Sequence, residues 1–171
     1  MIAQAVEEDI PLIVDLLNSA YRGERSQKGW TTEAHLIAGD VRTDEADVLK
    51  VFQLPGSIIL KYMNDAGEII GTVNLQLHER GIYLGMFAVN PNLQGGGIGK
   101  QLLKAADEYA QKIDSTTIYM SVISVRTELI DWYKRHGFTE TGERKPFVQD
   151  NLTGTHLQPL EFLILEKQIH S

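Results

Sequence analysis

The sequence predicts a single α/β (α+β) domain over residues 1–171, in which strands and amphipathic helices alternate. Apolar residues recur at helical spacing near the N-terminus and again after residue 98. Between these segments, three runs with strand patterning are separated only by short turns, which predicts hairpin-linked strands. A glycine cluster joins the last of them to a helix. With 43% hydrophobic residues, a chain of this length can build one ordinary core.

The N-terminal third is expected to begin with a short strand over residues 2–5, followed by a helix. Asp9 is the expected cap of this helix, and Pro11 lies in its first turn. One face of the helix is apolar, at Ile13, Leu16, Leu17, Ala20 and Tyr21. The segments expected next are a polar loop at residues 21–29, a helix near 32–39 and a helix at 45–52.

The rest of the chain alternates between strands and helices. The three hairpin-linked strands are expected at residues 57–63, 68–77 and 82–89. The helix after the glycines has an apolar face formed by Ile98, Leu102, Ala105, Ala106, Tyr109 and Ile113. The elements expected last are a strand at residues 116–122, a helix at 126–136, a strand starting at Phe138, an irregular polar segment at 144–159 and a strand at 160–165. This order contains about seven strands.

The glycine cluster is the most informative local feature. It reads Gln94-Gly95-Gly96-Gly97-Ile98-Gly99 and leads directly into Lys100 and a helix. Glycine lets the backbone adopt positive φ and approach a ligand closely, at a cost of roughly 0.5–1 kcal/mol in regular structure. The N-terminus of a helix offers unpaired N–H groups and a positive dipole end, both suited to a phosphate. The cluster therefore predicts a phosphate-binding loop.

Two well-known phosphate loops are excluded by spacing. A Walker loop needs a glycine five residues before Gly99, where Gln94 stands, and a hydroxyl residue where Gln101 stands. A dinucleotide fingerprint needs a glycine three residues after Gly97, where Lys100 stands, and it normally follows the first strand of a βαβ unit.

The pattern Gln-x-x-Gly-x-Gly resembles the acetyl-CoA motif of the GNAT superfamily of N-acetyltransferases. A second segment, Tyr133-Lys-Arg-His-Gly137-Phe138, is similar to the Tyr-x-x-x-Gly-Phe element near the end of that family's domain. Gly137 also suits a helix C-cap that requires positive φ. The resemblance covers most of the chain. It implies a GNAT fold, whose mixed, mostly antiparallel sheet splays between its fourth and fifth strands to admit CoA.

The resemblance also implies which residues hold acetyl-CoA. The pyrophosphate would be bound by Gln94, Gly95, Gly96, Gly97, Ile98, Gly99 and Lys100. The pantetheine arm would bind along the backbone of Phe87, Ala88 and Val89, and an amide of this strand would hold the acetyl carbonyl. Arg126 stands where many relatives carry an asparagine that contacts CoA, so it is a candidate for a phosphate contact or for capping a helix.

Tyr133 falls on the position of the family's tyrosine, which lies near the CoA sulfur and acts as a general acid where it is catalytic. Residues implied to flank the acceptor site are Tyr21, Arg22 and Trp30. Some relatives carry a glutamate base in the strand before the glycine loop, but residues 81–89 contain no acid. The remaining candidates for the base are Glu24, Glu33, His78, Glu79 and Glu161.

The expected function is direct acetyl transfer from acetyl-CoA to the amine of a small molecule, amino acid or peptide in a ternary complex. An acyl-CoA-binding sensor without turnover is the alternative, and a longer acyl donor stays open. Without cysteine, an acyl-cysteine intermediate and thiolate metal sites are excluded, and we expect no metal. The net charge of −7 disfavours a nucleic-acid partner. Without a leader or long apolar run, we expect a cytoplasmic protein with no membrane partner; a homodimer is a possibility the family suggests.

Overall fold

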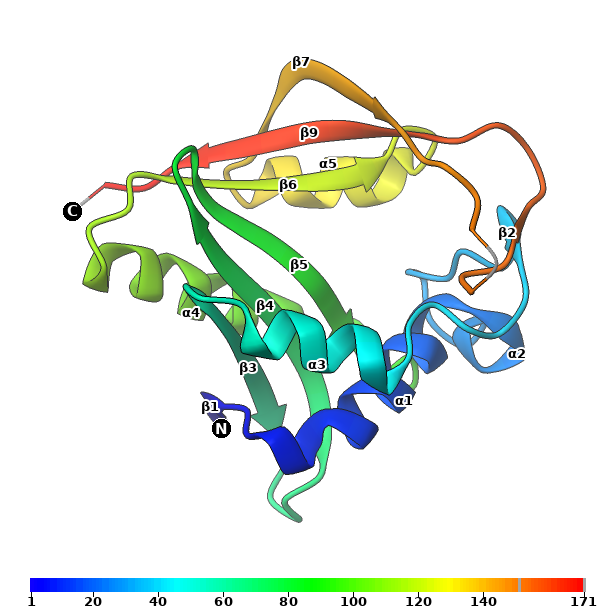
Figure 1. Cartoon of the computed structure of the whole chain (residues 1–171), viewed down its shortest axis with the longest axis horizontal. Helices are drawn as coiled ribbons and strands as arrows, with labels where there is room; N and C mark the ends of the chain where they lie inside the picture. The colour runs from blue at the N-terminus through cyan, green and yellow to red at the C-terminus, as the bar shows by residue number, and fades with distance from the viewer. Residues whose placement is uncertain (151, 171) are drawn as a thin grey trace.

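The computed structural model describes residues 1–150 and 152–170. The strands of its main sheet are β1 (Ile2–Gln4), β3 (Ser57–Met63), β4 (Ile69–His78), β5 (Gly81–Val89), β6 (Thr117–Ile123), β7 (Thr139–Pro146) and β9 (Glu161–Gln168). They form one seven-stranded sheet in the order β1-β3-β4-β5-β6-β9-β7, and only β5 and β6 pair in parallel (Figure 1). This arrangement confirms the predicted mixed, mostly antiparallel sheet.

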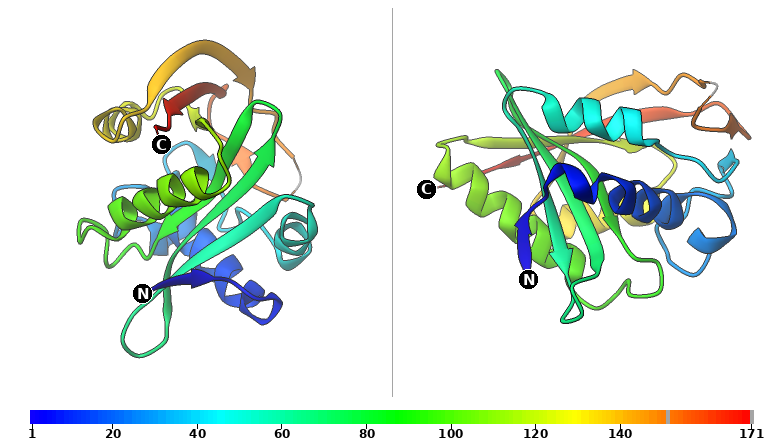
Figure 2. Two further views of the ribbon diagram at one scale, coloured as in Figure 1. Left: turned by 90° about the vertical axis from the view of Figure 1, so that its left-hand side faces the viewer. Right: turned by 60° about the horizontal axis from the view of Figure 1, so that its bottom comes forward.

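Helices cover both faces of the sheet (Figures 1 and 2). The helical elements are η1 (Glu7–Asp9), α1 (Ile10–Tyr21), α2 (Gly23–Ser26), α3 (Glu45–Gln53), α4 (Ile98–Lys112) and α5 (Thr127–Arg135). Successive strand side chains point to opposite faces. Accordingly, Ile59 packs in a cluster with α1 and α3, whereas its neighbours Ile58 and Leu60 pack in the cluster that holds α4 and α5.

The sheet opens between β5 and β6. The two strands pair only at Ile82 with Ile118 and at Tyr83 with Tyr119, whereas β6 stays paired with β9 along its length. On its other edge, β5 carries an extra residue opposite β4, and Met86 there has a φ of 49°. Such a bulge bends a strand and interrupts its ladder of hydrogen bonds. Because β5 and β6, the fourth and fifth strands of the main sheet, pair at only two positions, the predicted splay between them is confirmed.

The predicted helix near residues 32–39 is wrong. This segment forms turns and the short strand β2 (Ile37–Ala38), which pairs with β8 (Thr155–His156). The physical reason is tertiary: Leu36 and Ile37 are buried against Ile123 and Leu160, and this packing outweighs local helix propensity.

Two loop boundaries also need correction. The expected polar loop at 21–29 contains the one-turn helix α2, and the expected irregular segment at 144–159 contains the end of β7 and the whole of β8. The strand β8 forms where the chain meets the distant β2, whereas α2 packs beside the preceding helix α1. The predicted strands at 57–63, 68–77 and 82–89 and the helices at 45–52 and 126–136 are confirmed to within a residue or two.

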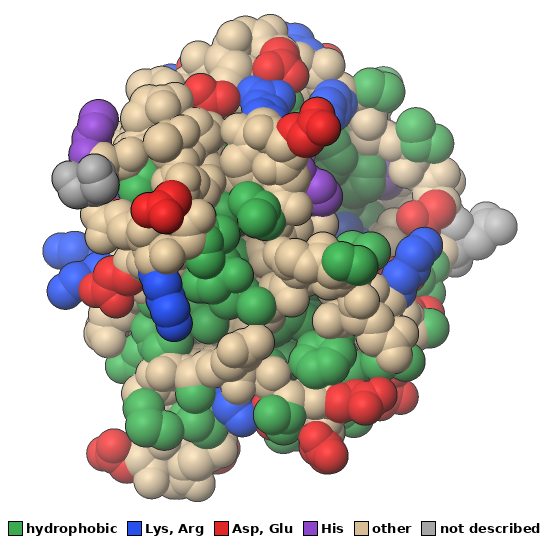
Figure 3. Space-filling model, turned by 60° about the vertical axis from the view of Figure 1, so that its left-hand side comes forward, with side chains coloured by type: hydrophobic (Ala, Val, Ile, Leu, Met, Phe, Trp, Pro, Cys, Tyr) green, Lys and Arg blue, Asp and Glu red, His purple; other side chains and the backbone are tan. Residues whose placement is uncertain are grey.

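Seen with the left-hand side of Figure 1 turned forward, acidic and basic side chains are scattered over the surface and apolar ones lie between them (Figure 3). Within residues 1–150 and 152–170, no helix has the length and apolar content needed to cross a bilayer. No group of His, Asp and Glu side chains in the same residues is placed to hold a metal ion.

Lys61 and Asp9 form an ion pair of 2.8 Å that fastens η1 to β3, and both side chains are only 14% exposed. Burial alone would raise the pKa of Asp9, but hydrogen bonds from Lys61 and from the Val6 N–H outweigh it and lower the pKa. A carboxyl whose pKa is lowered by folding stabilises the fold above its unfolded pKa, and this contribution is lost as the pH falls.

We therefore expect Lys61→Met to lower the free energy of unfolding by about 1 kcal/mol at pH 7, and by progressively less as the pH falls below the ordinary aspartate pKa of about 3.9 and the paired carboxylate is lost. Urea unfolding across this pH range measures both values. The exposed Lys145→Met variant is the control. If the difference in free energy of unfolding between wild type and Lys61→Met stays constant with pH, the Lys61–Asp9 ion pair is not its cause.

Candidate functional site

The glycine loop leaves a row of backbone donors free at the start of α4. Gly97 caps the helix with a φ of 85°, and Gly95 has a φ of 94°. A Cβ placed on either residue would meet nothing within 4 Å, so both face open space. Helical hydrogen bonding begins with Gln101 N donating to Gly97 O at 3.1 Å, and no described residue accepts from the N–H groups of residues 95–100. Free N–H groups at the start of a helix are an arrangement that can hold an anion.

A groove with a volume of about 460 Å³ runs from this loop along β5 to α5. The predicted site residues that line it are Tyr21, Trp30, Phe87, Ala88, Val89, Gln94, Gly95, Gly97, Ile98, Gly99 and Lys100. Gly96 belongs to the loop but not to the groove wall. The structure therefore brings together the glycine loop, the end of β5 and two of the three residues expected at the acceptor side.

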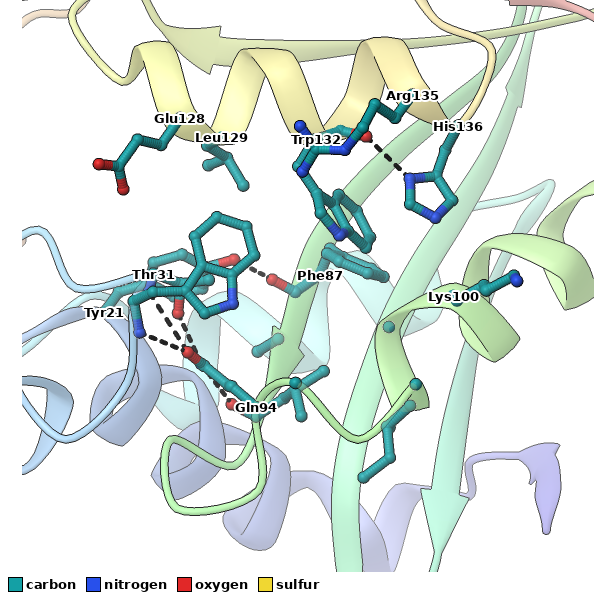
Figure 4. Close-up of a pocket in the computed structure, with 17 residues that line it drawn as sticks. Tyr21, Thr31, Phe87, Gln94, Lys100, Glu128, Leu129, Trp132, Arg135 and His136 are labelled. Atoms are coloured by element: carbon teal, nitrogen blue, oxygen red, sulfur yellow. Dashed lines mark hydrogen bonds between the residues drawn. The ribbon is translucent and has the colours of Figure 1, made fainter.

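The opposite wall comes from α5, which the sequence reasoning used only for Tyr133. Trp132 and His136 lie one turn apart on this helix with ring centroids 4.3 Å apart, and both hang over the groove (Figure 4). Trp132 also packs at 6.0 Å from Phe87 and at 6.1 Å from Trp30. The sequence does contain a signal for this wall, because two aromatic residues four positions apart lie on the same face of a helix. Other lining residues not predicted are Thr31, Glu128, Leu129 and Arg135.

The side chain of Gln94 is occupied inside the protein. Its Oε1 accepts from the N–H groups of Trp30 at 2.8 Å and Thr31 at 3.3 Å. Its Nε2 donates to Thr31 Oγ1 at 2.7 Å and to Val89 O at 3.1 Å. Gly29 lies so close to this amide that a Cβ there would clash with it. Gln94 therefore ties the loop before β2 to the glycine loop (Figure 4) and does not point its amide at an anion in the groove.

A second, smaller cavity of about 170 Å³ lies where β5 and β6 separate. It shares the lining residues Tyr21, Phe87 and Leu129 with the groove, so the two spaces are adjacent. Tyr133 lines this cavity and is 2% exposed. Burial raises the pKa of its phenol well above the ordinary value; Tyr21 adds to the effect, and Arg42 and Arg126 oppose it. The phenol therefore stays protonated at neutral pH and has an O–H to donate.

The charged residues of the second cavity lie around Glu33, which is 6% exposed. Its Oε1 accepts from Arg22 Nε at 3.1 Å, and its Oε2 lies 3.8 Å from Arg126 Nη1. Arg22 also donates to the carbonyls of Val41 and Thr153, and it lines neither cavity. Arg22, which the sequence suggested for the acceptor site, therefore lies outside both cavities and contacts Glu33, which lines the second one.

Arg126 lines the second cavity and not the groove, so the structure does not bring it to the phosphate loop. Tyr21 lies between the two spaces, and its hydroxyl donates to the carbonyl of Phe87. Of the candidates for the base, Glu33 alone lines either cavity. The others are the exposed Glu24, His78 and Glu79, and Glu161, which pairs with Arg144.

Comparison with known proteins identifies relatives of this arrangement. A sequence profile of the acetyltransferase (GNAT) family matches residues 12–138. No curated protein sequence matches the chain.

Several solved structures share its fold. The ribosomal-protein-S18-alanine N-acetyltransferase from Escherichia coli superposes with a TM-score of 0.74 at 16% identity, covering 100% of this chain and 94% of that chain. The ribosomal-protein-alanine N-acetyltransferase from Brucella melitensis superposes with a TM-score of 0.73 at 21% identity, covering 99% of both chains. A spermidine N-acetyltransferase chimera from Vibrio cholerae and hSSAT gives 0.69 at 15% identity, covering 98% of this chain and 94% of that chain.

Proposed function

The chain belongs to the acetyltransferase (GNAT) family, and on this premise we propose that it transfers an acetyl group directly from acetyl-CoA to the amine of a small molecule, amino acid or peptide. In this proposal the groove and the second cavity bind different substrates. The groove takes the CoA arm, and the second cavity takes the acceptor. The two are adjacent at Tyr21, Phe87 and Leu129, where the reacting atoms would come together.

The residues present fit the phosphates of CoA. The free N–H groups of residues 95–100 and the open space above Gly95 and Gly97 form a cradle that a side chain would fill. Lys100 and Arg135 line the same groove and add positive charge. Backbone amides at a helix start with nearby cations bind pyrophosphate strongly. These features support the expected roles of the glycine loop and of Phe87, Ala88 and Val89.

When bound, acetyl-CoA supplies a thioester: the amine nitrogen bonds to the acetyl carbon, the C–S bond breaks, the nitrogen loses a proton and the sulfur gains one. The chain contributes donors for the charges that develop. The bulge at Met86 frees backbone polar groups of β5 from the ladder with β4, beside the place where the carbonyl oxygen would lie. Tyr133 would donate to the departing sulfur. Since the carboxylate of Glu33 is hydrogen-bonded to Arg22 and lies near the charge of Arg126, it is poorly placed to act as a base, and the acceptor amine is proposed to react in its neutral form.

The observation that carries the proposal is a groove with unpaired backbone N–H groups at a helix start, next to a cavity lined by the buried Tyr133. The test is free-thiol release from acetyl-CoA by the purified protein with polyamines, amino acids, aminoglycosides and short peptides, with calorimetric CoA binding alongside. Release that depends on one class of amine supports the enzyme. Tight CoA binding without release on any amine would favour the non-catalytic sensor, and no binding would refute the proposal.

Gln94 provides a further prediction, because its amide holds the loop that carries Trp30 and Thr31 against the groove. Gln94→Ala removes these hydrogen bonds and is expected to weaken CoA binding about tenfold while lowering the free energy of unfolding by about 1–2 kcal/mol. Calorimetry and urea unfolding measure the two effects. Gln101→Ala on the exposed side of α4 is the matched control. Unchanged CoA affinity in Gln94→Ala would show that the loop is irrelevant to the groove.

A further inference from the structure

The wall of the second cavity carries more positive than negative charge. Its charged lining residues are Arg42, Arg126 and Glu33, and Glu33 is the only acid that lines it within residues 1–150 and 152–170. The carboxylate of Glu33 is already paired with Arg22 through Nε at 3.1 Å. One buried acid thus faces three guanidinium groups, and burying an uncompensated charge is costly.

Arg126 has a donor to spare. The residue is 7% exposed, and its Nη1 is a buried nitrogen without a hydrogen-bond partner among the described residues. Its nearest acid oxygen, on Glu33, lies 3.8 Å away, and its Nη2 reaches only the Trp30 carbonyl at 3.5 Å. Buried polar atoms are normally paired, so an orphaned guanidinium nitrogen at a cavity wall indicates a missing acceptor.

Arg42 lines the same cavity. Its guanidinium carbon lies 4.1 Å from the centre of the Tyr21 ring. Among the described residues it has no acid partner and donates no side-chain hydrogen bond, although its backbone N–H is held by Asn18. Arg22, by contrast, is satisfied by Glu33 and two carbonyls. The two arginines with free donors are therefore the two that line the cavity.

We infer that Arg42 and Arg126 recognise a carboxylate on the acceptor, so that the protein acetylates a small molecule carrying both an amine and a carboxylate. The inference rests on the proposed function and names its substrate class. A guanidinium presents paired donors that match a carboxylate, and two of them at one small cavity select for it. The cavity of about 170 Å³ is of a size for such a group rather than for a folded chain.

A polyamine is disfavoured by the same residues. The net charge of −7 attracts cations to the protein as a whole. At the place of reaction, however, the second ammonium group of a polyamine would face Arg42 and Arg126, and like charges at close range reject a ligand. Charges elsewhere on the surface are screened beyond a Debye length of roughly 8–10 Å, so the charges of the cavity wall decide the specificity.

Matched acceptors test the inference. Each amino acid is compared with its primary amide, which has the same shape without the charge, and with the amine that lacks the carboxyl group. The kcat/KM for the amino acid is expected to exceed that for either analogue by about a hundredfold or more. Equal rates on the charged and uncharged acceptors would overturn the inference while leaving the proposed function intact. A preference for the aminophosphonate analogue over the carboxylate would also overturn it.

Variants assign the effect to the two arginines. Arg126→Gln is expected to bring the ratio of amino acid to amide close to one, and Arg42→Gln to lower it about tenfold, mainly through the KM of the acceptor and without change in CoA affinity. Arg126→Lys should retain part of the preference. Arg25→Gln, on the exposed surface of α2, is the matched control. Since Arg42 is only half-buried, its variant keeps the test valid if Arg126→Gln fails to fold.

A direct binding measurement separates the two proposals. If no amine causes thiol release, the proposed function fails. Calorimetry of an amino acid and of its amide with the CoA-loaded protein then tests whether Arg42 and Arg126 bind a carboxylate. Binding of the amino acid alone supports the role of Arg42 and Arg126. Equal binding of the two probes, or binding of neither, overturns it.

Discussion

Replacing Gly97 by valine is expected to lower the affinity for CoA by about a hundredfold or more. A Cβ at this position projects into the open space above the loop, where the phosphates are proposed to lie, and valine also disfavours the φ of 85°. The valine side chain would then fill part of the space in which the loop N–H groups are proposed to contact the phosphates. Isothermal calorimetry with CoA measures the loss, and circular dichroism establishes that the variant is folded.

Gly142 and Gly67 provide the controls for this variant. Both have positive φ, 87° and 79°, and a Cβ on either meets nothing within 4 Å, but both lie outside the groove. Gly142→Val and Gly67→Val should therefore suffer a similar backbone strain of about 1–2 kcal/mol and bind CoA normally. If all three variants lose affinity equally, strain rather than the cradle explains the loss.

Tyr133→Phe is expected to lower kcat by about ten- to a hundredfold while changing the affinity for CoA less than about twofold. The ring remains to pack against Phe87, Trp132 and Phe138, so the fold should be retained, and only the donor to the departing sulfur is removed. Steady-state kinetics with saturating acetyl-CoA, together with calorimetry, separate the two parameters.

The pH dependence follows from the same residue. Because burial raises the pKa of the Tyr133 phenol well above its ordinary value, the donor stays protonated through about pH 9, and kcat should show no fall from its ionisation in that range.

The matched control for Tyr133→Phe is Tyr109→Phe, at a half-buried position on α4. Wild-type turnover in Tyr133→Phe would remove the phenol from the mechanism.

Much of the fold could be predicted because its signals are local. The hairpin-linked strands alternate in pattern between short turns, and the glycine loop with the helix after it is encoded in one short stretch of sequence. The short strand β2 could not be found in this way, since Leu36 and Ile37 are fixed by burial against Ile123 and Leu160, far away in the chain. Tertiary packing of this kind overrides local propensity.

The site was predicted unevenly for the same reason. The glycine loop and the end of β5 are contiguous in sequence, and the structure brings them to one groove. The second cavity depends on the separation of β5 from β6, and its two arginines, Arg42 and Arg126, come from distant segments, so no spacing in the sequence indicates it. Arg22 and Arg126 were candidates for ligand contacts, but their partners could be assigned only from the distances to Glu33.

The most direct test of the account is a single-turnover reaction with acetyl-CoA labelled in its acetyl group, an amino acid acceptor and the purified protein, followed by mass spectrometry of both the acceptor and the intact chain. Direct transfer predicts that the label appears in the acceptor as an amide, at the rate of thiol release, with the protein mass unchanged throughout. Thiol release without a labelled acceptor, or label retained on the protein, would contradict direct transfer between the groove and the second cavity.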